Sequence, residues 1–350
     1  MPIVFEGVSY SYTAPAKPKD AKKPRIKAKE ASIPGERPAW GNAPDALWAI
    51  HDIDFTLEDG DFLGIAGHTG SGKSTLIQHM NGLIHPTLGR VLIDGTDIAD
   101  KKAASRIRGK VGLVFQYPEH QLFAANVYDD VAFGPRNLGL PPDEVDRCVR
   151  DALAQVSLDF DSLRTASPFE LSGGQQRRVA FAGVLAMRPS TLILDEPVAG
   201  LDPATRNSFL NLIAELHRQG LTVVLVSHNM NDLARLCNRV LVLKEGQQFA
   251  LGSPQEVFAH ADELKAIGLG VPSAQGLANR LVAQGVPLGD ISAALSPRRT
   301  AANPEGATKR LYDIESLADE LAALYKAQPA AGAIQPEETV HEGQAGGPYA

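Results

Sequence analysis

Cysteine is scarce in this sequence, and its scarcity excludes two kinds of protein. The 350 residues contain only two cysteines, Cys148 and Cys237, which lie far apart and match no metal-ligand spacing. A disulfide framework or a cysteine-based zinc site is therefore not expected. The composition fits a reducing, cytosolic compartment.

Long apolar runs are also missing. The longest, such as LTVVLV at 221–226, have the length of a strand, whereas a membrane-spanning helix needs about 20 apolar residues. The first residues, MPIVFEGVSYSY, have the pattern of neither a signal peptide nor a transit peptide. We therefore expect a chain that does not span a membrane.

Positive charge is not in excess either. The 41 acidic residues outnumber the 34 Lys and Arg, which gives a formal net charge of −7 and a pI near 5.7. Such a chain produces no overall basic field for the phosphate backbone of a nucleic acid, although local clusters could still act. We therefore expect no nucleic-acid partner.

Short aliphatic and β-branched runs recur along the chain and are separated in several places by helical patterns. They predict strands at 3–8, 62–65, 91–93, 111–115, 191–194 and 222–226. Because helices separate several of these strands, we expect an α/β fold with a largely parallel sheet. Residues 141–188 contain no convincing strand and read as helices. We therefore expect a main domain over 1–260 that contains a helical subdomain at 117–188.

Composition changes in an internal segment and beyond residue 260. Residues 13–45 are rich in Pro, Lys and Ala and poor in large aliphatic residues, which predicts a flexible, basic surface insertion. This insertion is either a simple length variation, which we favour, or a binding arm. Amphipathic patterns, as at 311–327, predict a small C-terminal helical domain over 261–327, and residues 328–350 predict a disordered tail.

The stretch GHTGSGKST has the pattern of a phosphate-binding loop, since it follows an apolar strand pattern and precedes a helical one. Its glycines let backbone N–H groups turn toward phosphates, and the helix N-terminus adds its dipole. We expect Lys73 to reach the β- and γ-phosphates of a nucleotide and the Ser74 hydroxyl to bind Mg²⁺. The expected nucleotide contacts are Gly67, His68, Thr69, Gly70, Ser71, Gly72, Lys73, Ser74 and Thr75, of which His68 occupies a variable loop position.

A second motif, TLILDEP at 191–197, is an apolar strand pattern that ends in two adjacent carboxylates. Alternation along a strand sends Asp195 and Glu196 to opposite faces, so the two need not share a role. Such a pair alone would more often cap a loop. With a phosphate loop upstream, we expect Asp195 to hold Mg²⁺ through its water shell and Glu196 to polarise the attacking water, a contribution of about 10²–10⁴ in rate.

A further glycine-rich stretch, LSGGQ at 171–175, contains no lysine. With the motifs above, it resembles the signature of the nucleotide-binding subunits of ABC transporters, a resemblance that covers about residues 1–12 and 46–260. It implies a P-loop ABC-type fold with a RecA-like core, an antiparallel β subdomain and a helical signature subdomain. It also implies a dimer, in which the γ-phosphate of ATP bound by one chain contacts the other chain through Ser172, Gly173, Gly174 and Gln175.

The same resemblance implies roles for four further residues. Tyr12 matches the aromatic residue that stacks on adenine, with Tyr10 as the second choice and plain strand packing as the alternative for either. Gln116 matches the glutamine that contacts Mg²⁺ and the attacking water. His228 matches the histidine that senses the γ-phosphate, and Asp202 ends the loop that follows the catalytic glutamate.

Within this family, the chain is similar to the ATPases of energy-coupling factor transporters in stretches such as GHTGSGKSTLIQHMNGLIHPTLGRVLIDG. The likeness implies an ATP-hydrolysing subunit at the cytoplasmic face of the cell membrane that powers uptake of a vitamin or a transition-metal ion. The implied partners are a second ABC ATPase, in a homodimer or heterodimer, a transmembrane coupling subunit and a substrate-binding membrane subunit. The ATPase of an ordinary ABC importer and a soluble ABC ATPase are the alternatives.

The loop after Gln116 contains three large apolar residues, Tyr117, Leu122 and Phe123. The family points this loop toward the membrane subunit, so we expect the three side chains to line a groove that receives a helix of the coupling subunit. The alternative is that they pack inward beneath the helical subdomain.

Overall fold

The structure is a computed structural model that describes residues 1–13, 48–100, 104–284, 317–318 and 321–322. The predicted insertion at 13–45, apart from its first residue, and the predicted tail at 328–350 lie outside the described residues. So does most of the amphipathic segment at 311–327. Within the described ranges, no helix combines the length and the apolar character needed to cross a membrane.

The first sheet is antiparallel and has four strands in the order β2-β1-β4-β5. These strands are β1 (Ile3–Tyr10), β2 (Ile50–Leu57), β4 (Leu88–Ile93) and β5 (Thr96–Asp97). Ile3 and Phe5 are buried, whereas Val4 and Glu6, which alternate with them, are half-buried. This period of two is the pattern of a strand with one face on a core.

The second sheet forms the centre of the molecule and has six strands in the order β10-β9-β3-β8-β7-β6. They are β3 (Phe62–Ala66), β6 (Val111–Val114), β7 (Thr191–Asp195), β8 (Thr222–Val226), β9 (Arg239–Lys244) and β10 (Gln247–Gly252). All pairs are parallel except β10 with β9. The predicted α/β fold with a largely parallel sheet is confirmed.

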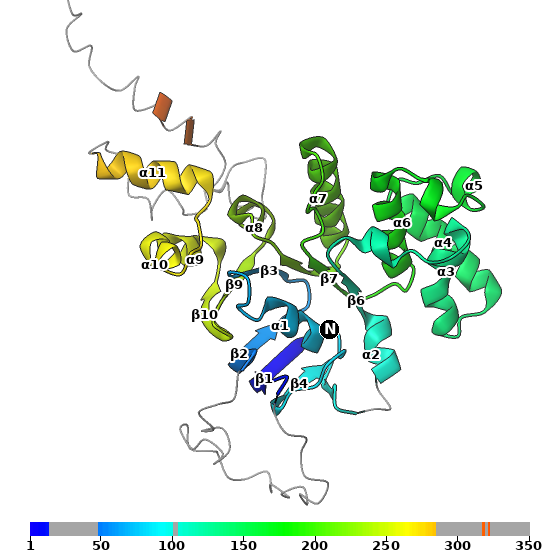
Figure 1. Cartoon of the computed structure of the whole chain (residues 1–350), viewed down its shortest axis with the longest axis horizontal. Helices are drawn as coiled ribbons and strands as arrows, with labels where there is room; N and C mark the ends of the chain where they lie inside the picture. The colour runs from blue at the N-terminus through cyan, green and yellow to red at the C-terminus, as the bar shows by residue number, and fades with distance from the viewer. Residues whose placement is uncertain (14–47, 101–103, 285–316, 319–320, 323–350) are drawn as a thin grey trace, which may run out of the picture.

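Helix α1 (Lys73–Met80) lies between the two sheets (Figure 1). Its residues Leu76 and Ile77 belong to the same buried cluster as Phe5 of the antiparallel sheet and Val224 of the central sheet. Burial of these apolar side chains stabilises the contact between the sheets, since each fully buried Leu, Ile, Val or Phe contributes about 1.5–3 kcal/mol. The start of α1 is thereby fixed at the edge of the central sheet.

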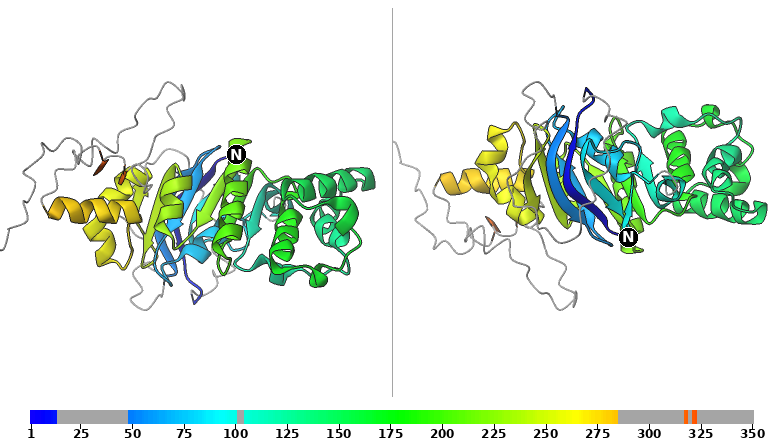
Figure 2. Two further views of the ribbon diagram at one scale, coloured as in Figure 1. Left: turned by 90° about the horizontal axis from the view of Figure 1, so that it is seen from above. Right: turned by 90° about the horizontal axis from the view of Figure 1, so that it is seen from below.

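The segment between β6 and β7 contains only helices. They are η1 (Pro118–Gln121), α3 (Val127–Asn137), α4 (Pro142–Gln155), α5 (Phe160–Leu163), η2 (Pro168–Glu170) and α6 (Gly173–Leu185), while α2 (Ala104–Lys110) precedes β6. Helices α3, α4, α5 and α6 form one end of the molecule (Figure 2). The α6 side chains Val179 and Phe181 are buried in the large core cluster that also covers one face of the central sheet.

The remaining described helices are α7 (Pro203–Arg218), α8 (Met230–Leu236), α9 (Pro254–Ala259), α10 (Ala261–Ala266) and α11 (Ser273–Ala283). Helices α9, α10 and α11 lie at the end opposite the α3–α6 helices (Figure 2). Leu317, from the far side of an undescribed segment, packs with Ala274 and Ala278 of α11. The boundaries predicted for the C-terminal domain remain a prediction.

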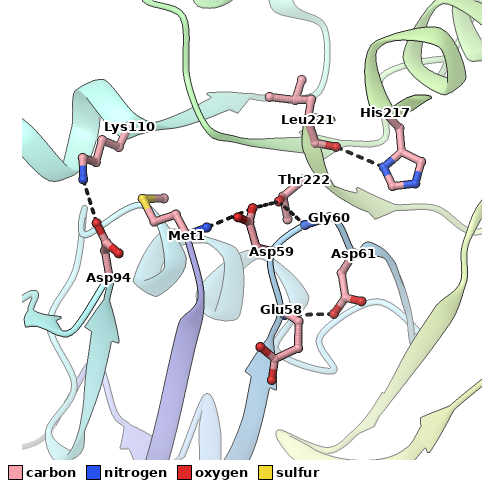
Figure 3. Close-up of polar contacts among 10 residues, drawn as sticks. All are labelled: Met1, Glu58, Asp59, Gly60, Asp61, Asp94, Lys110, His217, Leu221 and Thr222. Carbon is pink, nitrogen blue, oxygen red and sulfur yellow. Dashed lines mark hydrogen bonds and ion pairs between the residues drawn. The ribbon is translucent and has the colours of Figure 1, made fainter. Parts of the chain in front are cut away.

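A polar junction connects the antiparallel sheet to the central sheet (Figure 3). Asp59, in the turn between β2 and β3, lies 2.9 Å from the amino group of Met1 and accepts a hydrogen bond of 3.1 Å from the Thr222 hydroxyl of β8. The N–H of Gly60 donates to the same hydroxyl at 2.9 Å. The bond from the amino group, followed by that from Thr222, lowers the pKa of Asp59, so its carboxylate stays charged.

Candidate nucleotide-binding site

A cleft of about 530 Å³ opens at the carboxyl edge of the central sheet. It is lined by Tyr12, Ala49, Thr69, Gly70, Gly72, Lys73, Ser74, Thr75, Gln116, Asp195, Glu196 and His228. Strands β3, β6, β7 and β8 all end near it, because the carboxyl ends of parallel strands meet at one edge of a sheet. The fold therefore brings most of the predicted site residues into one cavity.

Glycine is required where the phosphate loop enters α1. Gly72 is the N-cap residue, with φ 99° and ψ 3° in the left-handed region. A Cβ atom at this position would lie 2.5 Å from the carbonyl oxygen of Ala49. No side chain caps the helix, so the N–H groups of its first turn can bind an anion.

The Lys73 ammonium lies inside this loop. The side chain is buried, and Nζ donates hydrogen bonds to the carbonyl oxygens of Gly67 at 2.7 Å and His68 at 3.0 Å. Burial lowers the pKa of Lys73, and the charges of Glu196 and Asp195 act in the opposite direction. A buried cation beside uncapped N–H groups is an arrangement suited to binding phosphate.

Three of the nine predicted loop contacts do not line the cleft, namely Gly67, His68 and Ser71. The His68 ring bonds through Nδ1 to the carbonyl oxygen of Thr69 at 2.6 Å. A Cβ at Gly67 would lie 2.3 Å from the Oγ of the fully buried Ser71. These residues determine the shape of the loop, and their predicted contacts with a nucleotide stay predictions.

The acidic end of β7 faces the same cleft. Glu196 has φ 47°, a left-handed backbone that is uncommon for a residue other than glycine, and its N–H donates to the carbonyl oxygen of Val226 at 3.1 Å. The His228 Nε2 lies 2.6 Å from Glu196 Oε1. Burial, and then the charge of Glu196, raises the pKa of Asp195, while Lys73 acts to lower it. The cleft is therefore lined by the carboxylates of Asp195 and Glu196, the ammonium of Lys73 and the imidazole of His228.

The oxygen atoms in the cleft fit a magnesium ion that is bound together with phosphates. Ser74, Gln116 and Asp195 supply a hydroxyl, an amide and a carboxylate oxygen to the same cavity. Mg²⁺ prefers oxygen ligands and is usually held by one or two carboxylates plus substrate phosphates. In the described part of the chain, no group of three or more His, Cys, Asp and Glu could hold a metal ion.

The second glycine-rich motif lies outside the cleft. Ser172 is the N-cap of α6, where its Oγ accepts from the N–H of Gln175 at 3.4 Å, and its own N–H donates to Gln175 Oε1 at 3.1 Å. Ser172 and Gly173 are exposed, and Gly174 and Gln175 are half-buried. None of the four lines the cleft of its own chain.

Asp202 also lies outside the cleft. It is the exposed N-cap of α7 and accepts from the N–H groups of Ala204 at 3.0 Å and Thr205 at 3.1 Å. Its contact with a nucleotide therefore stays a prediction, like that of the α6 motif.

Arg177, which no sequence motif identified, joins helix α6 to two of the loops around the site. The guanidinium is 4% exposed and forms two parallel hydrogen bonds with Glu119, of 2.9 and 2.7 Å. It also donates to the carbonyl oxygens of Pro197 at 3.2 Å and Ala199 at 2.9 Å. A bidentate pair of this kind fixes the geometry strongly, so the start of α6 is held against the loops that follow Gln116 and Glu196.

A groove of about 430 Å³ lies beside the loop after Gln116. The residues that line it include Leu122, Phe123 and Phe133. Phe123 is 58% exposed and meets the exposed Phe133 edge to face, with ring centroids 4.9 Å apart. Tyr117 is also exposed, but it does not line this groove. Leu122 lines the groove, as predicted, but it is only 7% exposed, because the chain leaves η1 at this residue and its side chain joins the core under the α3–α6 helices. For Leu122, the alternative of inward packing is therefore confirmed.

Comparison with known proteins places these observations in a family. The family model described as ABC transporter matches residues 50–199. The energy-coupling factor transporter ATP-binding protein EcfA2 of Symbiobacterium thermophilum is 53% identical over 286 residues, which cover 81% of this chain and 90% of that protein. Its counterpart in Caldanaerobacter subterraneus subsp. tengcongensis is 52% identical over 70% of this chain and 86% of that protein.

Solved structures give the same result. CbiO1 from Clostridium perfringens, described as part of the ABC transporter complex CbiONQ, is 34% identical with a TM-score of 0.61, over 79% of this chain and 98% of that chain. The ATP-binding cassette MJ0796, solved as a dimer with ADP and Pi, is 26% identical with a TM-score of 0.57, over 72% and 98% of the two chains. The chain therefore belongs to the ABC transporter family of ATPases and, within it, to the ATP-binding proteins of energy-coupling factor transporters.

Proposed function

We propose that this chain hydrolyses ATP, with Mg²⁺, to power uptake of a vitamin or a transition-metal ion through an energy-coupling factor transporter. The observation that carries the proposal is a single cleft that combines an uncapped helix N-terminus and Lys73 with Asp195, Glu196 and His228. The names of the relatives support the type of transporter.

The residues of the cleft divide the chemistry of phosphoryl transfer between them. The first turn of α1 and Lys73 bind the β- and γ-phosphates, and Ser74, Gln116 and Asp195 would hold Mg²⁺, which neutralises the charge that develops on the phosphates. Glu196 accepts a proton from the attacking water, a step that general bases accelerate by about 10²–10⁴. His228, at 2.6 Å from the Glu196 carboxylate, fixes the orientation of that carboxylate.

The α6 motif gives the reason to propose a dimer with a second ABC ATPase. Ser172 and Gly173 are exposed and lie outside the cleft of their own chain, so a nucleotide would reach them only from another chain. The dimeric cassette MJ0796 supports this arrangement. Closure of two chains on ATP would convert binding energy into movement, and hydrolysis would release the pair.

The groove beside Phe123 is the proposed docking site for a helix of the transmembrane coupling subunit, which works with a substrate-binding membrane subunit. Exposed aromatic residues next to a groove are the anchors that helix recognition uses. The chain would thus be a peripheral protein at the cytoplasmic face of the membrane.

Docking can be tested with an exposed residue. Phe123→Ser should release the chain from membranes and stop uptake, while ATP hydrolysis by the purified chain persists. Leu83→Ser is the matched control, because Leu83 is also a large exposed apolar residue but does not line the groove. Retention of the Phe123 variant on membranes would exclude the groove as the docking site.

The transporter type can be tested by purifying the tagged chain from membranes and identifying the proteins that accompany it. The proposal expects a transmembrane coupling subunit and an integral substrate-binding subunit. An external soluble binding protein would instead indicate an ordinary importer. Uptake of radiolabelled cobalt, nickel and a panel of vitamins, with Glu196→Gln as the inactive control, would identify the substrate.

A further inference from the structure

Tyr12 presents its ring at one side of the nucleotide cleft. The side chain is 65% exposed and lines the cavity together with residues of the phosphate loop. Its hydroxyl lies 3.2 Å from the Oγ1 of Thr75, on the first turn of α1. An exposed aromatic ring that is attached to the phosphate loop in this way is a platform on which a nucleobase can stack.

A ladder of aromatic rings supports this platform from behind. The Tyr10 ring meets the Tyr12 ring edge to face, with centroids 4.9 Å apart and an interplanar angle of 88°. On its other side Tyr10 meets the ring of His79, at 5.0 Å and 76°. Such edge-to-face pairs are the favoured arrangement of aromatic rings and each contributes about 0.5–1.5 kcal/mol beyond area burial.

His79, at the inner end of the ladder, is fully buried on α1. Its Nδ1 lies 2.7 Å from the carbonyl oxygen of Thr75, one turn earlier in the helix. Because a carbonyl oxygen can only accept, Nδ1 carries the proton of this bond. Burial lowers the pKa of His79 to about 4, so the ring is neutral near pH 7 and keeps this tautomer.

These contacts form a closed loop that begins and ends at Thr75. The loop runs from the Thr75 hydroxyl to Tyr12, then to Tyr10, to His79 and back to the Thr75 carbonyl oxygen. We propose that Tyr10 and His79 are positioning residues that hold the Tyr12 ring against the base of the nucleotide. The proposal rests on ATP binding in the cleft and adds the residues that favour a nucleotide over a bare polyphosphate.

The ladder has a specific energetic consequence. A ring that stacks on a base contacts the face of the base and not its edges. Stacking should therefore increase the affinity for adenine and guanine nucleotides by similar amounts. The phosphates would bind at the N-terminus of α1 and to Lys73, whose ammonium is held by the carbonyl oxygens of Gly67 and His68. Tyr12 and His79 bond instead to Thr75. Loss of the ladder should therefore weaken the binding of nucleotides and leave the binding of inorganic polyphosphate unchanged.

Calorimetry on the purified full chain can separate the two effects, with ATP, GTP and inorganic tripolyphosphate as the titrants in the presence of Mg²⁺. Tyr12→Leu should lower the affinity for ATP and GTP about tenfold, and Tyr10→Leu should lower it about fivefold. The affinity of both variants for tripolyphosphate should stay within about twofold of that of the parent chain. Tyr10→Phe keeps the ring and should bind all three like the parent. His79→Leu, which removes the inner end of the ladder, should behave like Tyr10→Leu.

Two results would overturn the proposal. One is normal ATP affinity in both Tyr10→Leu and His79→Leu. The other is an equal loss of ATP and tripolyphosphate affinity, which would mean that the rings only support the fold of the phosphate loop. A parent chain that binds none of the three titrants would overturn the proposed function as well, so the two failures are distinguishable.

Discussion

Helices α1 and α6 both begin in glycine-rich loops, but only the N-terminus of α6 is capped by a side chain. Helix α1 begins at Gly72 with no side-chain cap, inside the cleft, beside the buried Lys73. Helix α6 begins at Ser172 with a complete capping box formed with Gln175, on the surface and outside the cleft. The first N-terminus leaves its N–H groups for a ligand, whereas the second already satisfies some of them within its own chain.

This difference supports the proposal that the α1 loop binds a nucleotide alone and that the α6 loop does not. An uncapped N-terminus with a lysine offers several strong donors to phosphate. A capped N-terminus without a lysine offers few, so it can only add to a nucleotide that another loop already holds. Variants of the two loops and of their neighbours should therefore separate binding from hydrolysis.

The largest expected effect concerns hydrolysis. Glu196→Gln should lower kcat by about 10²–10⁴ because the general base is lost, while ATP still binds and holds the closed dimer. Steady-state ATPase assays combined with ATP titration measure both quantities. Glu58→Gln, at an exposed position outside the cleft, is the control. A normal rate in the Glu196 variant would show that the base has been assigned wrongly.

A smaller effect is expected for binding at the uncapped N-terminus. Lys73→Ala should weaken ATP binding about 10- to 100-fold, since a charge-assisted hydrogen bond to phosphate contributes about 1.5–3 kcal/mol, and turnover should nearly disappear. Lys110→Ala, which removes a lysine paired with Asp94 on the surface, should change neither quantity. Unchanged ATP affinity in the Lys73 variant would contradict the role given to this loop.

A third prediction tests the buried side of α1 through pH. The pKa of His79 is about 4 in the folded chain, because of burial, and a histidine in the unfolded chain titrates near 6.5. Between these values the unfolded state binds more protons, so the free energy of unfolding falls as the pH falls. From pH 7 to pH 5 the loss from this residue should be about 2 kcal/mol. Urea unfolding at both pH values should show a weaker pH dependence in His79→Phe, and an identical dependence would refute the assignment.

Much of the fold could be predicted from local patterns. The apolar run at 222–226 coincides with β8, and the other predicted strands each overlap an observed one. Strands β2, β5, β9 and β10 were not predicted, and β5 has only two residues. Four of the six residues of β9 are buried in a row, so it shows no alternation, and β10 is exposed or half-buried throughout. Periodicity cannot identify such strands well.

The positions of site residues could be predicted where their motifs directly follow regular strands. They could be predicted less well where loop conformation determines which way a side chain points. The phosphate loop and the β7 acids follow apolar strands, and the strands place them. The direction of Leu122 and the pairing of Arg177 with Glu119, 58 positions apart in the sequence, depend on tertiary packing. The same is true of the contact between Tyr10 and His79. No local pattern reports such contacts.

The central claim is that the α1 loop binds ATP within its own chain and the α6 loop does not. It is tested most directly by the ATP affinity of Ser172→Arg, measured at concentrations at which the chain is monomeric, with Lys73→Ala as the reference for lost binding. The account predicts that Ser172→Arg binds ATP like the parent chain and that only its hydrolysis is impaired. A loss of affinity comparable to that of Lys73→Ala would contradict the account, because it would mean that the α6 loop binds the nucleotide of its own chain.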